Sequence, residues 1–204
     1  GSGVFYMGKI NFKADAVTSE KELRELVGSP HQFVKNKIVS VIDDQCKKFI
    51  SMSPLLFLAT ADADGKCDVS PRGDKPGAVY VLNESQLVIA DRPGNRRVDS
   101  ILNILSNPHV GLLFVVPGMD EVLRINGSAT IIKNREILSH MTLNDKLPLL
   151  GIGVDVEECF IHCTRALQKS KIWKEHTWPD PEGVPSMMEI FRAHIKVNGF
   201  ELKE

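Results

Sequence analysis

The chain has almost no excess of charge and no long apolar run. Its 204 residues include 25 lysines and arginines against 26 aspartates and glutamates, a formal net charge of -1. This balance gives no global attraction to nucleic acid, so any anion site must be local. No stretch approaches the roughly 20 apolar residues that a helix needs to cross a bilayer, so we expect no membrane span. The amino-terminal stretch also lacks the charged-then-apolar layout of a secretory signal.

Cysteines are few and do not form a framework. Cys46, Cys67, Cys159 and Cys163 show no close, even spacing, which is typical of a reducing compartment, and we expect a cytoplasmic protein. The run CFIHC brings His162 between two of them, but no second ligand pair with zinc-site spacing exists in the sequence. We interpret this run as a buried strand and expect no metal site.

The common catalytic motifs are missing as well. Ser70 has no GxSxG context, the six histidines form no HExxH, and there is no GxGxxG or Walker A loop. The sequence therefore names no catalytic residue. Small barrels that bind oligonucleotides place aromatics among basic residues, whereas only 6% of this chain is aromatic, so nucleic acid is not expected as a partner.

Helical patterns occupy both ends of the chain. Ser19 with Glu22 has the form of a capping box, and Ser29-Pro30 predicts the start of a longer helix with one apolar face, which ends at Ser53-Pro54. We thus expect N-terminal helices over about 19–52. A last helix, SMMEIFRAHIK, is predicted within a helical extension over about 164–204.

The middle of the chain alternates short apolar runs with turn residues. LLFLATAD, CDVSPR, AVYVL and QLVIAD are separated by ADG, GDKPG and NES, which predicts antiparallel strands joined by tight turns. HVGLLFVVP, EVLRINGSATII and GVDVEECFIHC continue the pattern, and Asn134 is expected to cap a short helix. Strands do not alternate with helices as in a parallel sheet. We therefore predict an antiparallel barrel, mainly β with peripheral helices (α+β).

The stretch ADRPGNRRVDS carries an unusual concentration of charge. If Asn95 caps the following helix, Arg96 and Arg97 lie in its first turn, where the helix dipole is already positive. A bound phosphate would reverse the sign of that interaction, and helix N-termini bind phosphate well. Arg72, in SPRGDKPGAV, could reach the same ligand. The alternative is that these side chains point into water, at a cost of only a few tenths to about 1 kcal/mol.

Both tryptophans lie in the polar tail. Trp173 and Trp178 are too close to prolines and charged residues to be ordinary core residues. They could cover the mouth of the barrel. Alternatively, they could contact a ligand or a partner subunit, because tryptophan is enriched at interfaces.

The order of the central motifs resembles a known family. SPRGD, QLVIAD, PGNRRVDS, ILNILSNP, HVGLLF and RINGSATI, with QKSKIW in the tail, resemble the FMN-binding split barrels related to pyridoxamine 5'-phosphate oxidase. The closest branch is one of FMN-dependent enzymes of that class. The resemblance runs from about Pro54 to Trp173. It implies that residues 1–204 form a single FMN-binding domain around a six-stranded antiparallel split β-barrel, with FMN bound at a homodimer interface.

The resemblance also assigns residues to the cofactor. It places one strand beside the flavin, a second strand against the ring or ribityl chain, an arginine turn on the phosphate, and a late segment that reaches the cofactor from one of the two chains. In that order, the residues are Pro71, Arg72 and Gly73; Ile89 and Ala90; Asn95, Arg96 and Arg97; and Lys169, Ser170 and Trp173.

The expected function is that of an FMN-dependent oxidoreductase acting on an unidentified small molecule, which serves as substrate or electron donor. The oxidase's substrate-gripping C-terminal residues have no clear match. Arg192 and His194 occur as R-A-H in a different context, so pyridoxamine phosphate is not expected as the substrate. The alternative is a non-catalytic protein that binds flavin, haem or a deazaflavin, since some split barrels hold those groups.

Overall fold

The computed structural model describes residues 6–31, 37–92 and 98–200. The chain divides into two compact units, Gly1–Ile38 and Val39–Glu204. The single-domain organisation and the cytoplasmic location inferred above stay predictions. Among the described residues, no helix has the length and apolar character to cross a membrane.

The first unit contains a 3-10 turn, η1 (Phe12–Asp15), and helix α1 (Glu20–Val27). The Ser19 hydroxyl accepts a hydrogen bond from the Glu22 N–H (3.1 Å), which confirms Ser19 as the N-cap. The Glu22 carboxylate in turn accepts from the Thr18 N–H (3.3 Å), one residue earlier than in a standard capping box. Gly28, with φ +79°, ends the helix.

The second unit starts with an irregular stretch that includes one β-bridge, where a continuous helix was predicted. Helix α3 (Asp44–Met52) begins only after its N-cap Asp43, whose carboxylate accepts from the Cys46 N–H (2.8 Å). The prediction of one continuous helix from Pro30 to Ser53 is wrong because the backbone at Val39 pairs with the sheet, while residues 32–36 of that predicted helix lie outside the described residues. Val39 exchanges two hydrogen bonds with Cys159 (3.0 and 2.7 Å), which a helical Val39 could not make. The predicted end of the helix at Ser53 is confirmed.

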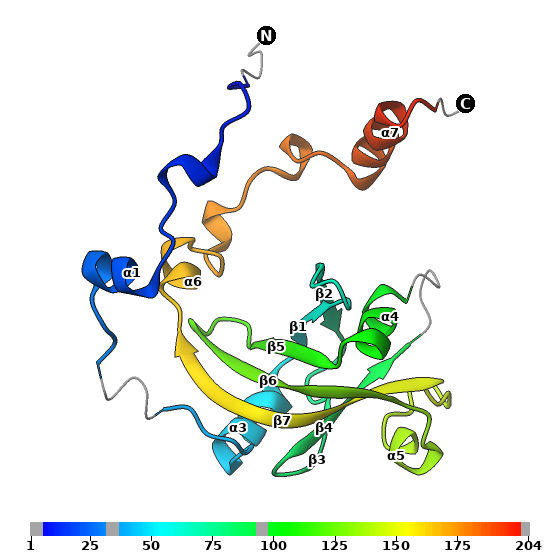
Figure 1. Cartoon of the computed structure of the whole chain (residues 1–204). Helices are drawn as coiled ribbons and strands as arrows, with labels where there is room; N and C mark the ends of the chain where they lie inside the picture. Colours follow the sequence, from blue (N-terminus) through cyan, green and yellow to red (C-terminus); the bar gives the residue numbers. More distant parts are fainter. Residues whose placement is uncertain (1–5, 32–36, 93–97, 201–204) are drawn as a thin grey trace. The chain divides into compact units, whose positions relative to one another are not determined.

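Seven strands form one antiparallel sheet in the order β2-β1-β5-β6-β7-β4-β3 (Figure 1). The predicted class, mainly β with peripheral helices, is confirmed, but the sheet has seven strands, not six. The number six came from the family resemblance, whereas all seven apolar runs noted in the sequence form strands, and β2 and β3 are the edges of the described sheet. The strands are β1 (Leu55–Ala61), β2 (Cys67–Gly73), β3 (Tyr80–Asn83), β4 (Gln86–Asp91), β5 (His109–Val115), β6 (Glu121–Ile132) and β7 (Leu150–Cys163).

The core lies inside the curve of this sheet. Leu56 and Leu58 of β1 belong to the same buried cluster as Leu87 and Ile89 of β4, although these strands are far apart in the strand order. The two ends of the sheet must therefore approach each other. Burial of each such side chain contributes roughly 1.5–3 kcal/mol, so the core holds the curved sheet in shape.

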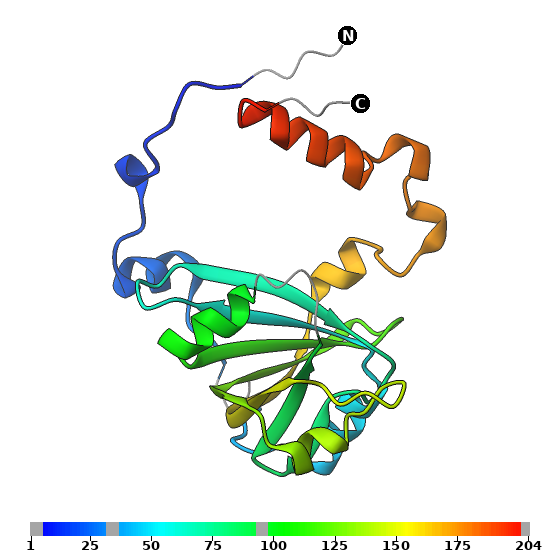
Figure 2. The ribbon, with the colours of Figure 1, turned by 90° about the vertical axis from the view of Figure 1, so that its right-hand side faces the viewer.

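Besides α3, two short helices between the strands lie beside the sheet, and one of them, α4, starts later than predicted. Helix α4 (Asp99–Ser106) packs Ile101 and Ile104 into the core and lies against β1 (Figure 2). Its N-cap is Val98, so Asn95 is not the cap and the first turn carries the acidic Asp99. An acidic residue there complements the positive end of the helix dipole.

This later start overturns the argument that the two arginines occupy the first helical turn. Asn95, Arg96 and Arg97 lie outside the described residues. The other helix, α5 (Arg135–Ser139), is capped by Asn134 as predicted: the Asn134 side chain accepts from the Ile137 N–H (3.0 Å).

The tail contains α6 (Arg165–Lys169), the 3-10 turns η2 (Glu175–Thr177) and η3 (Pro181–Gly183), and α7 (Met187–Val197). The predicted last helix is confirmed, and Ser186 with Glu189 forms a complete capping box at its start. No residue of these elements is buried.

Candidate functional site

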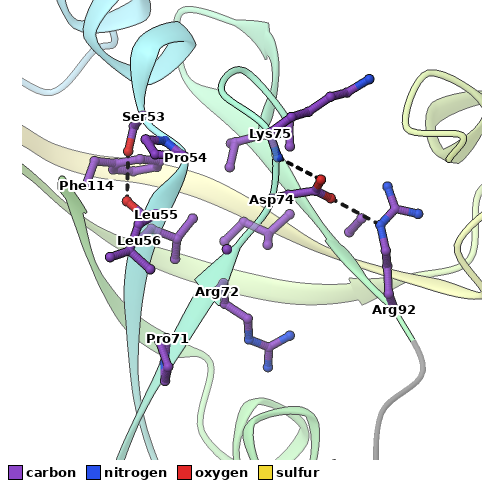
Figure 3. A pocket seen from close by; sticks show the side chains of 15 residues that line it. Ser53, Pro54, Leu55, Leu56, Pro71, Arg72, Asp74, Lys75, Arg92 and Phe114 are labelled. Carbon is purple, nitrogen blue, oxygen red and sulfur yellow. Dashed lines mark hydrogen bonds and ion pairs between the residues drawn. The ribbon is translucent and has the colours of Figure 1, made fainter. Parts of the chain in front are cut away.

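A cleft opens where the two ends of the curved sheet meet (Figure 3). Its volume is about 250 Å³. One wall comes from the start of β1 and the end of β2, and the other from the end of β4. The lining residues are Ser53, Pro54, Leu55, Leu56, Pro71, Arg72, Gly73, Asp74, Lys75, Ala78, Val79, Ile89, Ala90, Arg92 and Phe114.

The strands on both sides of the cleft have edges that the sheet leaves unpaired. In the part of the chain that the structure describes, β2 pairs only with β1. The pairing of β3 with β4 stops at Tyr80–Val88, so within the described residues Ile89–Asp91 pair only with β7. Backbone N–H and C=O groups without a strand partner need another hydrogen-bonding partner. The cleft therefore offers main-chain donors and acceptors to a ligand.

An ion pair joins the two walls. Arg72 Nη1 of β2 donates to Asp91 Oδ1 of β4 at 2.8 Å. The two side chains are 24% and 17% exposed, so the pair is only partly screened by water. Only one nitrogen of the guanidinium is used, and the other N–H groups of Arg72 are without a partner among the described residues. Arg72 can thus contact an anion without leaving Asp91.

A second set of charges lies at the rim, beside the turn after β2. Figure 3 shows the Asp74 carboxylate between the Lys75 backbone N–H (2.8 Å) and Arg92 Nε (3.4 Å). Arg92 also donates through Nη2 to Met141 O (2.8 Å). The Lys75 ammonium has no partner within the described part of the chain. Among the described residues, the cleft therefore carries three cations and two carboxylates, a balance of one positive charge.

The base of the cleft is apolar and tightly fixed. Leu56, Ile89 and Phe114 are buried there. The buried Ser53 hydroxyl lies 2.7 Å from Leu55 O and 2.6 Å from Val115 O, so it connects the start of β1 to the end of β5. Such a base can pack against a flat ring while the rim holds a charged group.

The residues with displaced pKa values lie elsewhere, at α3 and β7. Hydrogen bonding from the Cys46 backbone lowers the pKa of Asp43 below its usual value. Burial raises the pKa of the Cys46 and Cys159 thiols. Cys159 belongs to a strand, as predicted. Across residues 6–31, 37–92 and 98–200, no three His, Cys, Asp or Glu side chains are grouped as metal ligands.

The structure brings together part of the predicted site. Pro71, Arg72 and Gly73 of β2 and Ile89 and Ala90 of β4 line the same cleft. Asn95, Arg96 and Arg97 are among the residues that the structure does not describe.

The predicted late segment does not line the cleft of its own chain. Lys169 and Ser170 are exposed at the end of α6. Trp173 donates through Nε1 to Met119 O (2.9 Å) in the β5–β6 turn, and Trp178 donates to Ile172 O (2.9 Å). Neither Trp173 nor Trp178 lines this cleft in its own chain. The two interpretations of the tryptophans, as a cover of the barrel mouth or as a contact with a ligand or partner, therefore stay predictions.

The site residues assigned from the sequence leave out several residues that line the cleft. Arg92 follows QLVIAD directly, and Asp74 and Lys75 lie in the turn GDKPG, so their positions at strand ends were a usable signal. No local pattern distinguishes Phe114 or Ser53 from other residues, because only the curvature of the sheet brings them here.

Comparisons with known proteins agree with the motif order. A family model described as pyridoxamine 5'-phosphate oxidase matches residues 42–163. HupZ of Group A Streptococcus is 20% identical, with 60% of this chain and 95% of that one covered and a TM-score of 0.49.

Two further solved structures are similar to the chain. General Stress Protein 26 of Bacillus anthracis (16% identity, 56% and 92% covered) has a TM-score of 0.44. HutZ, the haem storage protein of Vibrio cholerae (16% identity, 60% and 94% covered), has a TM-score of 0.42. No curated protein matches the chain.

Proposed function

Because the chain belongs to the pyridoxamine 5'-phosphate oxidase family, we propose that it is an FMN-dependent oxidoreductase acting on a small molecule. FMN would lie in the cleft between β2 and the end of β4. A second copy of the chain would complete the site, so that the working form is a homodimer.

One observation carries this proposal: two strands that are not neighbours in the sheet expose unpaired edges to one cleft with an apolar base and cationic rim. This combination fits the chemistry of FMN, which has a flat ring edged with hydrogen-bonding atoms and an anionic phosphate. Leu56, Ile89 and Phe114 would support the ring. The carboxylates among the described residues do not fully neutralise the positive charges of Arg72 and Lys75.

The size of the cleft supports completion by a second copy. About 250 Å³ is somewhat below the roughly 300–1,000 Å³ usual for ligand sites. The family resemblance assigns the late segment, Lys169 to Trp173, to the cofactor from one of the two chains. These residues do not line the cleft of their own chain. In the proposed homodimer, the second copy would supply them to the cofactor.

The chemistry would come from the cofactor. FMN supplies electron or hydride transfer, and the protein contributes binding, orientation and electrostatics. Here the strand edges would orient the ring, the apolar base would keep water from one side, and Arg72 would stabilise negative charge. No side chain of the cleft is required as a proton donor for direct hydride transfer.

The first test is binding. Titration calorimetry of flavin-free protein with FMN should show an affinity that falls at least about tenfold in Arg72→Ala, since a charge-assisted hydrogen bond contributes roughly 1.5–3 kcal/mol. Arg96→Ala with Arg97→Ala should lower it further if the resemblance places the phosphate correctly. Arg135→Ala, an exposed arginine of α5, is the matched control. If Arg72→Ala and Arg135→Ala bound FMN with equal affinity, FMN would not bind in this cleft.

The second test separates an enzyme from a carrier. An oxidoreductase should consume a nicotinamide donor in repeated turnovers, whereas a carrier should bind FMN without turnover. Haem is a further alternative and would show a Soret band. None of the described residues that line the cleft is a histidine, so a haem ligated by a histidine of the same chain would need a different site.

A further inference from the structure

We propose that Asp91 is an internal competitor for Arg72: it compensates the charge of Arg72 when no ligand is bound, and it thereby lowers the affinity of the cleft for anions. FMN is taken as the ligand, so the inference rests on the proposed function. Three features of the described residues support it: the inward position of Arg72, the single partner of the Asp91 carboxylate, and the different bonding of the neighbouring ion pair.

Arg72 carries its charge on the inward side of the sheet. It lies opposite Leu56 of β1, which is buried in the core. Exposure alternates along β2, so that the adjacent Pro71 and Gly73 are exposed while Arg72 is not. A cation in such a position loses part of its hydration, which is costly unless an opposite charge compensates it. Arg72 therefore needs a counterion whenever no anionic ligand is present.

Asp91 supplies that counterion from the other wall of the cleft. Its Oδ1 accepts from Arg72 Nη1 at 2.8 Å. Four strands lie between β2 and β4 in the sheet order, so the pair spans the cleft and is not part of a strand ladder. Within the described part of the chain, the Asp91 carboxylate has no other hydrogen-bond partner, and Asp91 does not line the cleft. Asp91 thus acts on a ligand through Arg72.

The neighbouring ion pair is bonded differently. Figure 3 shows Asp74 linked to Arg92, and Asp74 also accepts from a backbone N–H of its own turn. Arg92 donates in addition to Met141 O at 2.8 Å. Each member of this pair has a second bond that does not depend on the other. The Arg72–Asp91 contact is therefore the one that a ligand can exchange, while the Asp74–Arg92 contact keeps the walls in place.

The sign of the effect follows from Coulomb's law. An anion beside a lone guanidinium meets a full positive charge, whereas beside the ion pair it also meets a carboxylate bonded to that guanidinium. The repulsion from the carboxylate cancels part of the attraction. Because the side chains of Arg72 and Asp91 are only 24% and 17% exposed, water screens this repulsion incompletely. Asp91 thus stabilises the ligand-free cleft and opposes the binding of an anion.

The decisive variant is Asp91→Asn, which removes the charge and keeps an oxygen that can accept from Arg72. Titration calorimetry of the flavin-free full chain should show an FMN affinity about fivefold higher than in the wild type. The affinity for riboflavin, which lacks the phosphate, should not change. The melting temperature of the ligand-free variant should fall, because Arg72 loses its counterion. A residue with a purely structural role would not combine a gain of affinity with a loss of stability.

Two variants serve as matched controls. Asp91→Glu keeps the negative charge and should not show the gain. Asp64→Asn changes the net charge of the chain by the same amount, but it lies in the exposed turn between β1 and β2. Because β1 starts at the cleft with Leu55 and ends beside this turn with Ala61, Asp64 is at the opposite end of the strand. Its replacement should leave the FMN affinity at the wild-type value.

Ionic strength provides a second measurement. Raising sodium chloride from about 0.05 M to about 0.5 M shortens the screening length from about 14 Å to about 4 Å. The gain of FMN affinity in Asp91→Asn should therefore become smaller at high salt. A gain that is independent of salt would mean that the removed charge is not its cause, and would overturn the proposal.

Inorganic phosphate separates this inference from the proposed function. At matched ionic strength, with chloride as the reference, phosphate should raise the melting temperature of Asp91→Asn more than that of the wild type. If the wild type bound no FMN but this difference were present, the proposed function would fail and the role of Asp91 would stand. If the wild type bound FMN and Asp91→Asn bound it equally or more weakly, the role of Asp91 would fail and the proposed function would stand. An equal gain for riboflavin and FMN, or the absence of both the FMN and the phosphate effects, would also refute the role of Asp91.

Discussion

The strand region and the flanking segments of this chain are stabilised in different ways. Across 55–163, buried side chains from five strands and helix α4 share one cluster. In the described flanks, 6–31 and 164–200, no residue is buried, although α1, α6 and α7 all have good caps. Capping residues are therefore sufficient to mark where a helix begins, but not to give it a tertiary position. A flanking segment whose helices have good caps but whose side chains are not buried is suited to contact something outside its own chain.

The sharpest test of this contrast uses the same substitution in both regions. Leu58 is fully buried in β1, whereas Leu26 of α1 is 67% exposed. Leu58→Ala should lower the free energy of unfolding by about 2–5 kcal/mol, because it leaves a cavity in the core. Leu26→Ala should change it by no more than about 0.5 kcal/mol. Urea unfolding followed by circular dichroism measures both, and similar losses would show that α1 is covered in solution.

A smaller effect is expected at the start of α4, where the strand region itself is strained. Val98 has φ +49°, a left-handed conformation that is costly for a β-branched residue, and its side chain caps nothing. Val98→Asn should raise the free energy of unfolding by about 1 kcal/mol, since asparagine tolerates this conformation and is a good N-cap.

Val184→Asn provides the control in the flank, where φ is -95°. It should have almost no effect on the melting temperature. A fall in the melting temperature of Val98→Asn would mean that the helix starts elsewhere.

The smallest expected effect concerns pH. Asp43 caps α3 in the strand unit, and hydrogen bonds lower its pKa when folded. Its contribution is therefore present above the unfolded pKa of about 3.9 and is lost as pH falls through the lower folded value. The flanking helices α1 and α7 have serine caps, which do not titrate. In Asp43→Asn, which keeps a cap, the decline in stability below about pH 4 should be shallower; an unchanged pH profile would contradict the assignment.

Much of the fold could be predicted from local patterns. The limits of β6, the caps Ser19 and Asn134 and the last helix follow from spacing and turn residues, and all are confirmed. The errors occur where distant backbone groups compete with a local signal. Val39 has helical spacing in the sequence but pairs with Cys159, and Asn95 is a favourable cap that the helix does not use.

The candidate site divides in the same way. The identities of Arg72 and of Ile89-Ala90 were visible as strand ends in a recognisable order of motifs. Their meeting, through Arg72 and Asp91, depends on the curvature of a seven-stranded sheet whose ends are held by shared core contacts. Lys169, Ser170 and Trp173 carry the same kind of family signal, but they do not line the cleft of their own chain, and the proposed second copy would supply them.

By itself, the sequence determined the class of each segment, because hydrophobic period, caps and turn residues act over a few positions along the chain. Only the tertiary structure decided where the helices truly start, how many strands pair, and which charges face each other across the cleft. The physical reason is that these features depend on hydrogen bonds and buried contacts between residues far apart in the chain. The energy of such contacts outweighs a local preference worth about 1 kcal/mol.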